Sequence, residues 1–139
     1  MDGRRWAGIP EPNPAGVGLT KFLLDSVILI DHLSGTRAAT DYIYEHHDYC
    51  AISVITRAEV LVPYVDKAAD PILRLLNSFR SLAIDAEAAD LASEFRRKHS
   101  WKLPDAFQAA LAKQHRLTLV TRNTKDFPTA KFKWVATPY

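Results

Sequence analysis

The chain has 139 residues, of which 47% are hydrophobic and 24% charged, a composition that excludes a disordered or a membrane protein and indicates one folded globular domain. The formal net charge of +2 permits a nucleic-acid partner but does not by itself argue for one. The single cysteine, Cys50, excludes an internal disulfide and a cysteine-based zinc site, and it lies in an apolar run typical of a buried thiol.

No apolar run approaches the roughly 20 residues that a membrane helix needs, so we expect no membrane span. Arg4 and Arg5 are not followed by the apolar core of an export signal, which favours a cytoplasmic protein. Residues 1–20 hold four of the five glycines and three of the eight prolines. This composition predicts an irregular N-terminal arm over residues 1–20, followed by a single domain over residues 21–139.

Beyond the arm, short β-branched and apolar runs alternate with longer helical patterns. The predicted strands are residues 21–25, 50–54, 81–84, 117–121 and 132–136. The predicted helices are residues 26–35, 36–47, 56–68, 70–79, 85–99 and 104–116. Strands separated by helices of this length predict an α/β fold with a parallel sheet covered by helices on its faces.

Several helix boundaries have local signals. Gly35 is expected to close the first helix, and Thr36 is expected to cap the second. Pro63 is expected to kink or interrupt the helix over residues 56–68. Pro71 and Pro104 fall in first helical turns, where proline is well tolerated.

Three carboxylates stand in otherwise apolar stretches: Asp25, Glu59 and Asp105. A buried carboxylate is costly to desolvate, so such groups are usually paired, protonated or bound to a metal. Without a nearby cysteine or histidine cluster, converging carboxylates indicate an oxygen-loving ion such as Mg²⁺ or Mn²⁺. The pattern therefore favours metal-assisted phosphoryl chemistry.

The polar residues follow predicted strands whose carboxyl ends meet at one edge of a parallel sheet, where functional crevices lie. Asp25 ends the first strand and Asn123 follows the fourth. Thr56 is expected to open the helix after the second strand, with Glu59 one turn further on. Asp105 has no strand directly before it and must reach this edge from a helix start.

Each acidic residue also has a purely structural interpretation. Asp25 is placed to cap a helix, and Thr56 with Glu59 forms a capping-box pattern. Asp105 is a first-turn acid favoured by the helix dipole. Asn123 and Asp126 fit a helix start in the same way, and a residue at a helix start can also face a metal.

Four motifs in order carry a resemblance to a known family: LLDSVILID, SVITRAEV, LPDAFQAALA and LTLVTRNTKDF. Together they resemble the PIN-domain ribonucleases, specifically the VapC-type toxins of toxin–antitoxin pairs, over about residues 21–136. The resemblance implies an α/β/α sandwich with a central parallel sheet of about five strands. It also implies an Mg²⁺- or Mn²⁺-dependent endoribonuclease that acts on RNA, a VapB-type antitoxin that blocks the site, and commonly a homodimer.

The family roles carry over to matching positions. Asp25, Glu59 and Asp105 resemble the acidic metal ligands, and Ser26 and Thr121 resemble the hydroxyl residues that support them. The family's fourth acidic position often holds Asp, whereas this chain has Asn123, and Asp126 is placed to substitute for it. The predicted catalytic residues are Asp25, Glu59, Asp105, Asn123 and Asp126.

Cations near the acidic motifs are candidates for holding RNA phosphates, with a solvated charged rim as the alternative. These candidates are Arg57, Lys102, Arg122 and Lys125. Trp101 is a candidate for stacking a base or an ordinary core aromatic. The five histidines are expected to be surface or half-buried residues, and they offer no evident pair for metal-free attack by the ribose 2′-hydroxyl. Attack by water is therefore predicted, and it gives a 5′-phosphate and a 3′-hydroxyl.

Two other functions are weighed against the nuclease. A PIN-like module that binds RNA or protein without cutting is suggested by Asn123 in the fourth position. A flavodoxin-like receiver domain is disfavoured, because it needs paired acids after the first strand, whereas Ser26 follows Asp25 here.

Overall fold

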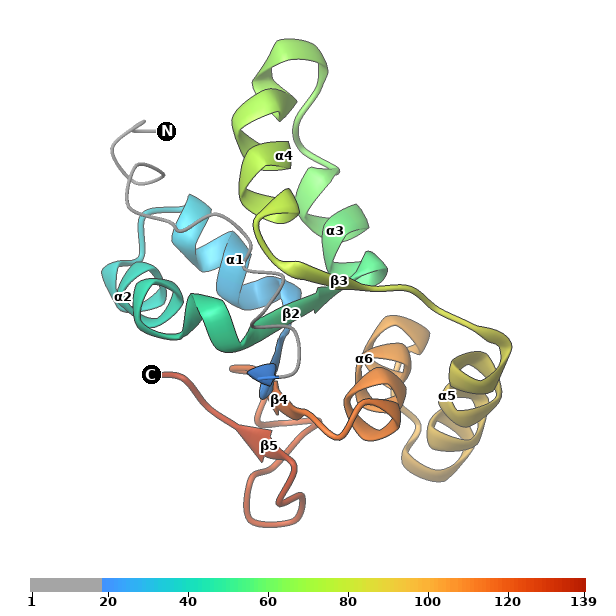
Figure 1. Cartoon of the computed structure of the whole chain (residues 1–139). Coiled ribbons are helices and arrows are strands. Elements are labelled where there is room, and N and C mark those ends of the chain that lie inside the picture. Colours follow the sequence, from blue (N-terminus) through green and yellow to red (C-terminus); the bar gives the residue numbers. More distant parts are fainter. Residues whose placement is uncertain (1–18) are drawn as a thin grey trace.

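A computed structural model describes residues 19–139 of the chain (Figure 1). Almost all of the predicted N-terminal arm, residues 1–20, lies outside the described residues. The domain boundary at residue 21 therefore stays a prediction. No helix in the part of the chain that the structure describes is both long and apolar enough to cross a bilayer.

A five-stranded sheet forms the centre of the fold, and each of its four strand pairs is parallel. The strands are β1 (Phe22–Leu24), β2 (Cys50–Ser53), β3 (Arg80–Leu82), β4 (Thr118–Val120) and β5 (Val135–Ala136). Their spatial order is β3-β2-β1-β4-β5, so β1 lies in the middle with β2 and β4 beside it. The predicted parallel α/β sheet of about five strands is confirmed.

Between Phe22 and Ala136, all within the described residues, six α-helices and two short 3₁₀ turns connect the strands. They are α1 (Ser26–Leu33), α2 (Arg37–His46), η3 (His47–Tyr49), α3 (Val54–Leu61), η4 (Asp66–Ala69), α4 (Asp70–Asn77), α5 (Ala86–His99) and α6 (Leu103–Gln114). Figure 1 shows α1 to α4 gathered on one side of the sheet and α5 and α6 on the other, with α4 projecting furthest from the strands. The molecule is therefore an α/β/α sandwich.

The alternation of side chains along the strands divides the core between the two faces. Leu23 and Leu119 belong to the apolar cluster that contains the buried residues of α5 and α6. Leu24, Ile52 and Val120 belong to the cluster that contains those of α1, α3 and α4. Because the central strands are buried on both faces, their sequence is a continuous apolar run rather than an alternating one.

Helix α3 differs from its predicted bounds at both ends. Its N-cap is Ser53, whose side chain accepts a hydrogen bond from the Thr56 amide at 3.1 Å. Thr56 is therefore inside the helix and fully buried, and the capping-box interpretation of Thr56 with Glu59 is wrong. The helix ends at Leu61, so the helix predicted over residues 56–68 is interrupted at Pro63 rather than kinked there, which is one of the two predicted outcomes.

Two histidines are buried, contrary to the prediction that all five lie at or near the surface. His32 is fully buried with its Nδ1 atom 2.7 Å from the Thr40 hydroxyl. His47 places Nε2 2.9 Å from the Ser78 hydroxyl, and burial lowers its pKa. Each imidazole has a hydroxyl partner, and the hydrogen bond to it offsets part of the energetic cost of burying the ring.

Candidate active site

Asp25 lies at the carboxyl end of the central strand and is the N-cap of α1. Its Oδ1 atom accepts a hydrogen bond from the Ser26 amide at 2.8 Å, and its Oδ2 atom accepts one from the Thr121 hydroxyl at 2.6 Å. Thr121 directly follows β4, the neighbouring parallel strand. Only 8% of Asp25 is exposed, so this carboxylate is held in one orientation at the edge of the sheet.

Glu59 reaches the same region from α3. Burial raises the pKa of its carboxyl, the hydrogen bond from the Ser26 side chain lowers it, and the negative charge of Asp25 raises it again. The net direction is upward. Glu59 therefore lies near both Asp25 and Ser26, although 34 residues or so separate it from them in sequence.

Asp105 lies in the first turn of α6 and is half-buried. Burial raises its pKa to about 6, helped by the negative charges of Asp25, Asp126 and Glu59, while Lys102 lowers it. The negative charges of three carboxylates from three other segments therefore act on Asp105. A half-buried acid that is crowded by like charges is typical of sites that bind cations or do acid–base chemistry.

The segment after β4 forms a tight turn that joins Asn123 to Asp126. The Asn123 amide donates to the Thr121 hydroxyl at 3.0 Å, and its side-chain Nδ2 donates to Asp126 Oδ2 at 3.0 Å. The Asp126 amide in turn donates to Asn123 Oδ1 at 3.3 Å. Residues 124–127 form a turn and not a helix, so the helix-start interpretation of Asn123 and Asp126 is wrong. Asn123 instead orients the Asp126 carboxylate.

A buried polar chain that the sequence analysis missed links the two helices that carry Glu59 and Asp105. Gln108 of α6 donates through Nε2 to the Thr56 hydroxyl at 2.7 Å, and Thr56 donates to the Leu24 carbonyl at 3.4 Å. Gln108 and Thr56 are almost completely buried. The available signal was a glutamine in the alanine-rich, apolar stretch of α6, one turn after Asp105.

The four predicted RNA-contact cations differ in their partners. Arg57 donates to the Asn77 side chain at 2.9 Å, and Arg122 donates to both carboxylate oxygens of Asp31 at 2.6 and 3.0 Å. Lys102 is exposed and close enough to Asp105 to lower its pKa. Lys125 is exposed in the turn after β4. Trp101 is only 4% exposed, which agrees with a core aromatic rather than a stacking platform.

The donor set at the edge of the sheet suits a hard divalent cation. The four interacting groups are carboxylates, and their mutual repulsion at Asp105 is the charge imbalance that a cation relieves. Within residues 19–139, no three Asp, Glu, His or Cys side chains already surround a common point closely enough to hold an ion. Because Mg²⁺ keeps several waters and needs only one or two direct carboxylates, these residues still fit such an ion.

Comparison with known proteins places the chain in a family. It matches the family model described as PIN domain over residues 22–133. It is 35% identical over 113 residues to Ribonuclease VapC10 of Mycobacterium tuberculosis (strain ATCC 25618 / H37Rv), covering 76% of this chain and 85% of the relative. The chain therefore belongs to the PIN-domain family.

Solved structures agree with this assignment. A chain of a toxin–antitoxin complex from Klebsiella pneumoniae is 37% identical with a TM-score of 0.73, and the match covers 86% of this chain and 98% of that one. A chain of DNA-bound VapBC from Salmonella typhimurium has a TM-score of 0.69 at 20% identity, covering 86% and 99%, and shows the shared fold alone. Within the PIN-domain family, the predicted resemblance to the VapC-type members is confirmed.

Proposed function

We propose that this chain is a metal-dependent endoribonuclease that acts as the toxin of a toxin–antitoxin pair. The observation that carries the proposal is the meeting of Asp25, Glu59, Asp105 and Asp126 at one edge of the sheet, where burial and the negative charges of the other three acids raise the pKa of Asp105 to about 6. The relative named Ribonuclease VapC10 supports RNA as the substrate. We place this activity in the cytoplasm.

Asp25 and Asp105 are the residues proposed to hold the ion, Mg²⁺ or Mn²⁺, with Glu59 and Asp126 beside them. When bound, such an ion lowers the pKa of a bound water and stabilises charge on phosphodiester oxygens. Asp25 is suited to this role because Ser26 and Thr121 fix both of its oxygens. Each of these oxygens retains a further lone pair for a cation.

The remaining residues position groups around the acids. Asn123 holds Asp126 through its side-chain amide, so Asp126 takes the role of the family's fourth acid. Exposed Lys102 and Lys125 offset the repulsion between an RNA phosphate and the carboxylates. Attack by water rather than by a ribose hydroxyl gives a 5′-phosphate and a 3′-hydroxyl.

An antitoxin partner is supported by the similar chain in the Klebsiella pneumoniae toxin–antitoxin complex. The helices on the α1–α4 side present an apolar surface for it. Val62 and Val65 are 79% and 70% exposed and Tyr44 is 42% exposed, while Tyr42 and Tyr64 are partly buried against the core on this side of the sheet. We propose that an apolar antitoxin segment binds here and that two copies of the chain form a homodimer.

The nuclease is tested with purified protein and single-stranded RNA in Mg²⁺ or Mn²⁺, with the ends of the products mapped. We expect cleavage by the unaltered chain and at least a 100-fold lower rate for Asp25→Ala and Asp105→Asn. Asp90→Asn is the matched control, since Asp90 is an exposed carboxylate on α5 outside the cluster. Equal activity in all three variants would refute the site.

An RNA- or protein-binding module without nuclease activity is the other outcome of this experiment. It is supported if the purified chain binds RNA but leaves it intact in both metals. The toxin role has a separate test, because expression of the active chain alone should arrest growth. Harmless expression of an active enzyme would reject the toxin role and leave the nuclease standing.

A further inference from the structure

A hollow of about 300 Å³ lies beside the acidic cluster, between the end of α5 and the loop before β5. We call it the Lys98 pocket. Its cationic and aromatic lining residues are Lys98, Lys125, Lys131, His99, Trp101 and Phe132. The volume is at the lower end of the range for small-ligand sites, which suits a single nucleotide rather than a duplex.

The floor of the Lys98 pocket is built from fixed aromatic rings. Trp101 donates its indole N–H to the Asp126 carbonyl at 3.0 Å, and its own carbonyl accepts from Arg96 at 2.6 Å. The His99 ring stacks on Trp101 at 4.2 Å between centroids, and Phe132 contacts His99 edge-on at 5.4 Å. These contacts form the pocket before any ligand binds, which lowers the entropic cost of binding.

The rim of the pocket is strongly cationic. Lys98, Lys125 and Lys131 are exposed, and within the described part of the chain none of them forms an ion pair with an acid. Burial lowers the pKa of His99, and the positive charges of Lys131 and Lys98 lower it further. Three ammonium groups beside a surface of aromatic side chains combine the two features that hold single-stranded nucleic acid, which are attraction of the phosphates and stacking of the bases.

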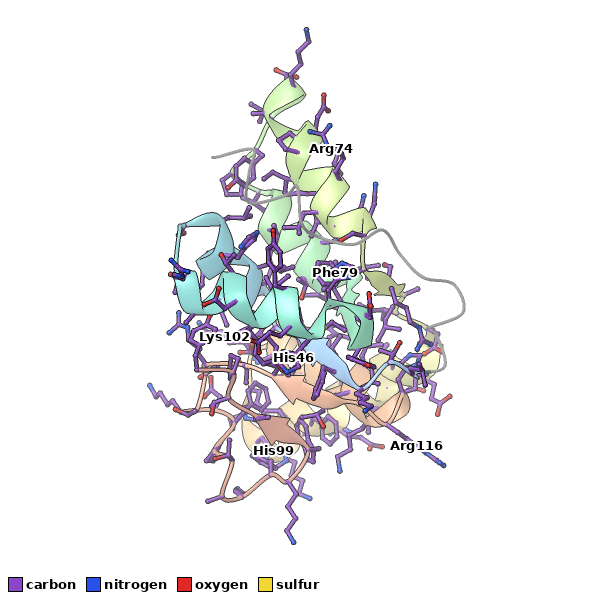
Figure 2. All side chains as sticks on the ribbon, turned by 60° about the vertical axis from the view of Figure 1, so that its left-hand side comes forward. His46, Arg74, Phe79, His99, Lys102 and Arg116 are labelled. Carbon is purple, nitrogen blue, oxygen red and sulfur yellow. The ribbon has the colours of Figure 1, made fainter. Side chains whose placement is uncertain are left out.

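Asp126 connects this pocket to the acidic cluster. Asp126 lines the pocket, and its negative charge contributes to the raised pKa of Asp105. Asp126 therefore adjoins both the pocket and the acidic cluster. Figure 2 shows His99 beside the C-terminal segment, at the end of the molecule opposite to Arg74 on α4.

We propose that the Lys98 pocket binds the nucleotide of single-stranded RNA that adjoins the cleaved bond. Its phosphate pairs with Lys98, Lys125 and Lys131, and its base or ribose lies against His99 and Phe132. The proposal rests on the proposed ribonuclease function, since it assigns the next position of the same substrate.

The test compares two double variants that remove the same charge. Lys98→Ala with Lys131→Ala alters the pocket, and Lys67→Ala with Arg74→Ala alters exposed cations on η4 and α4. Binding of a single-stranded RNA 12-mer is measured by fluorescence anisotropy across a salt series, in EDTA so that no cleavage occurs. Cleavage in Mn²⁺ is measured in parallel to obtain kcat and KM.

The pocket variant should bind RNA about 10-fold more weakly at low salt, and the slope of log K against log salt should fall by about 1.4, at roughly 0.7 for each lost phosphate contact. KM should rise with little change in kcat, and Lys98→Arg with Lys131→Arg should restore binding. The control variant should stay within about twofold of the unaltered chain.

Equal losses in the pocket and control variants would overturn the proposal. So would a polyglutamate peptide that displaces RNA from the unaltered chain and binds the pocket variant less well, because the pocket would then take an acidic peptide. Failure of the ribonuclease function looks different. The unaltered chain would then leave RNA uncut in Mn²⁺, while the pocket variant alone would still lose RNA binding.

Discussion

Replacement of Asp105 by asparagine removes a half-buried carboxylate that is surrounded by the negative charges of Asp25, Asp126 and Glu59. The pKa of Asp105 rises from 3.8 to about 6, a difference of about 2 units, and each unit corresponds to about 1.4 kcal/mol. The ionised carboxylate therefore destabilises the metal-free fold by at most about 3 kcal/mol. Solvent screening at this half-buried site reduces the expected gain for Asp105→Asn to about 1–2 kcal/mol.

The gain should depend on pH in a defined direction. Because the folded-state pKa of Asp105 is raised, the folded chain holds the proton more tightly than the unfolded chain. The unaltered chain therefore loses stability as pH rises from about 4 to about 6, and the asparagine variant lacks this loss. Asp105→Asn should match the unaltered chain below pH 4 and exceed it by the full amount above pH 6.

Urea unfolding followed by circular dichroism, in EDTA at pH values from 4 to 8, measures this difference. Asp90→Asn, which removes an exposed carboxylate from α5, should change the free energy of unfolding by less than about 0.5 kcal/mol at every pH. The reasoning is refuted if Asp105→Asn is no more stable than the unaltered chain at pH 7.5. It is also refuted if the difference in stability between the two chains is as large at pH 4 as at pH 7.5.

Three further changes test the site. Thr121→Val removes the 2.6 Å hydrogen bond to Asp25, so cleavage should fall about 10-fold and unfolding free energy by about 1–2 kcal/mol, with activity recovered in Thr121→Ser. Millimolar Mn²⁺ should raise the melting temperature of the unaltered chain and leave Asp25→Ala unchanged; equal shifts would contradict metal binding there. Gln108→Leu should raise KM or lower kcat. It should lower the free energy of unfolding by less than about 1.5 kcal/mol, because Thr56 keeps its hydrogen bond to Leu24. A larger loss of stability in urea unfolding would show that Gln108 mainly stabilises the core.

The fold was largely predictable because its signals are local. Apolar runs of four or five residues predicted the buried strands, and Pro71 and Pro104 lie in the first turns of α4 and α6 as expected. Gly35 follows α1 with φ of 92°, a conformation that favours glycine. These features depend on residues within a few positions of one another.

The errors arose where two local signals competed or where burial decided. Ser53 and Thr56 can each cap a helix, and only the buried position of Thr56 in α3 distinguishes them. His32 and His47 are buried because hydroxyl groups of Thr40 and Ser78 lie next to them in space. Ser78 is 31 residues from His47, so its role could not be inferred from neighbouring positions.

By itself, the amino-acid sequence determined the order of strands and helices, the apolar core and the chemistry that its carboxylates favour. Only the tertiary structure decided which of those carboxylates act together. Thr121 donates to Asp25 across 96 positions of sequence because β1 and β4 are paired in parallel and end at the same edge. The raised pKa of Asp105 has the same origin, since burial and the negative charges that lie near the carboxylate in space both result from the folding of distant segments against it.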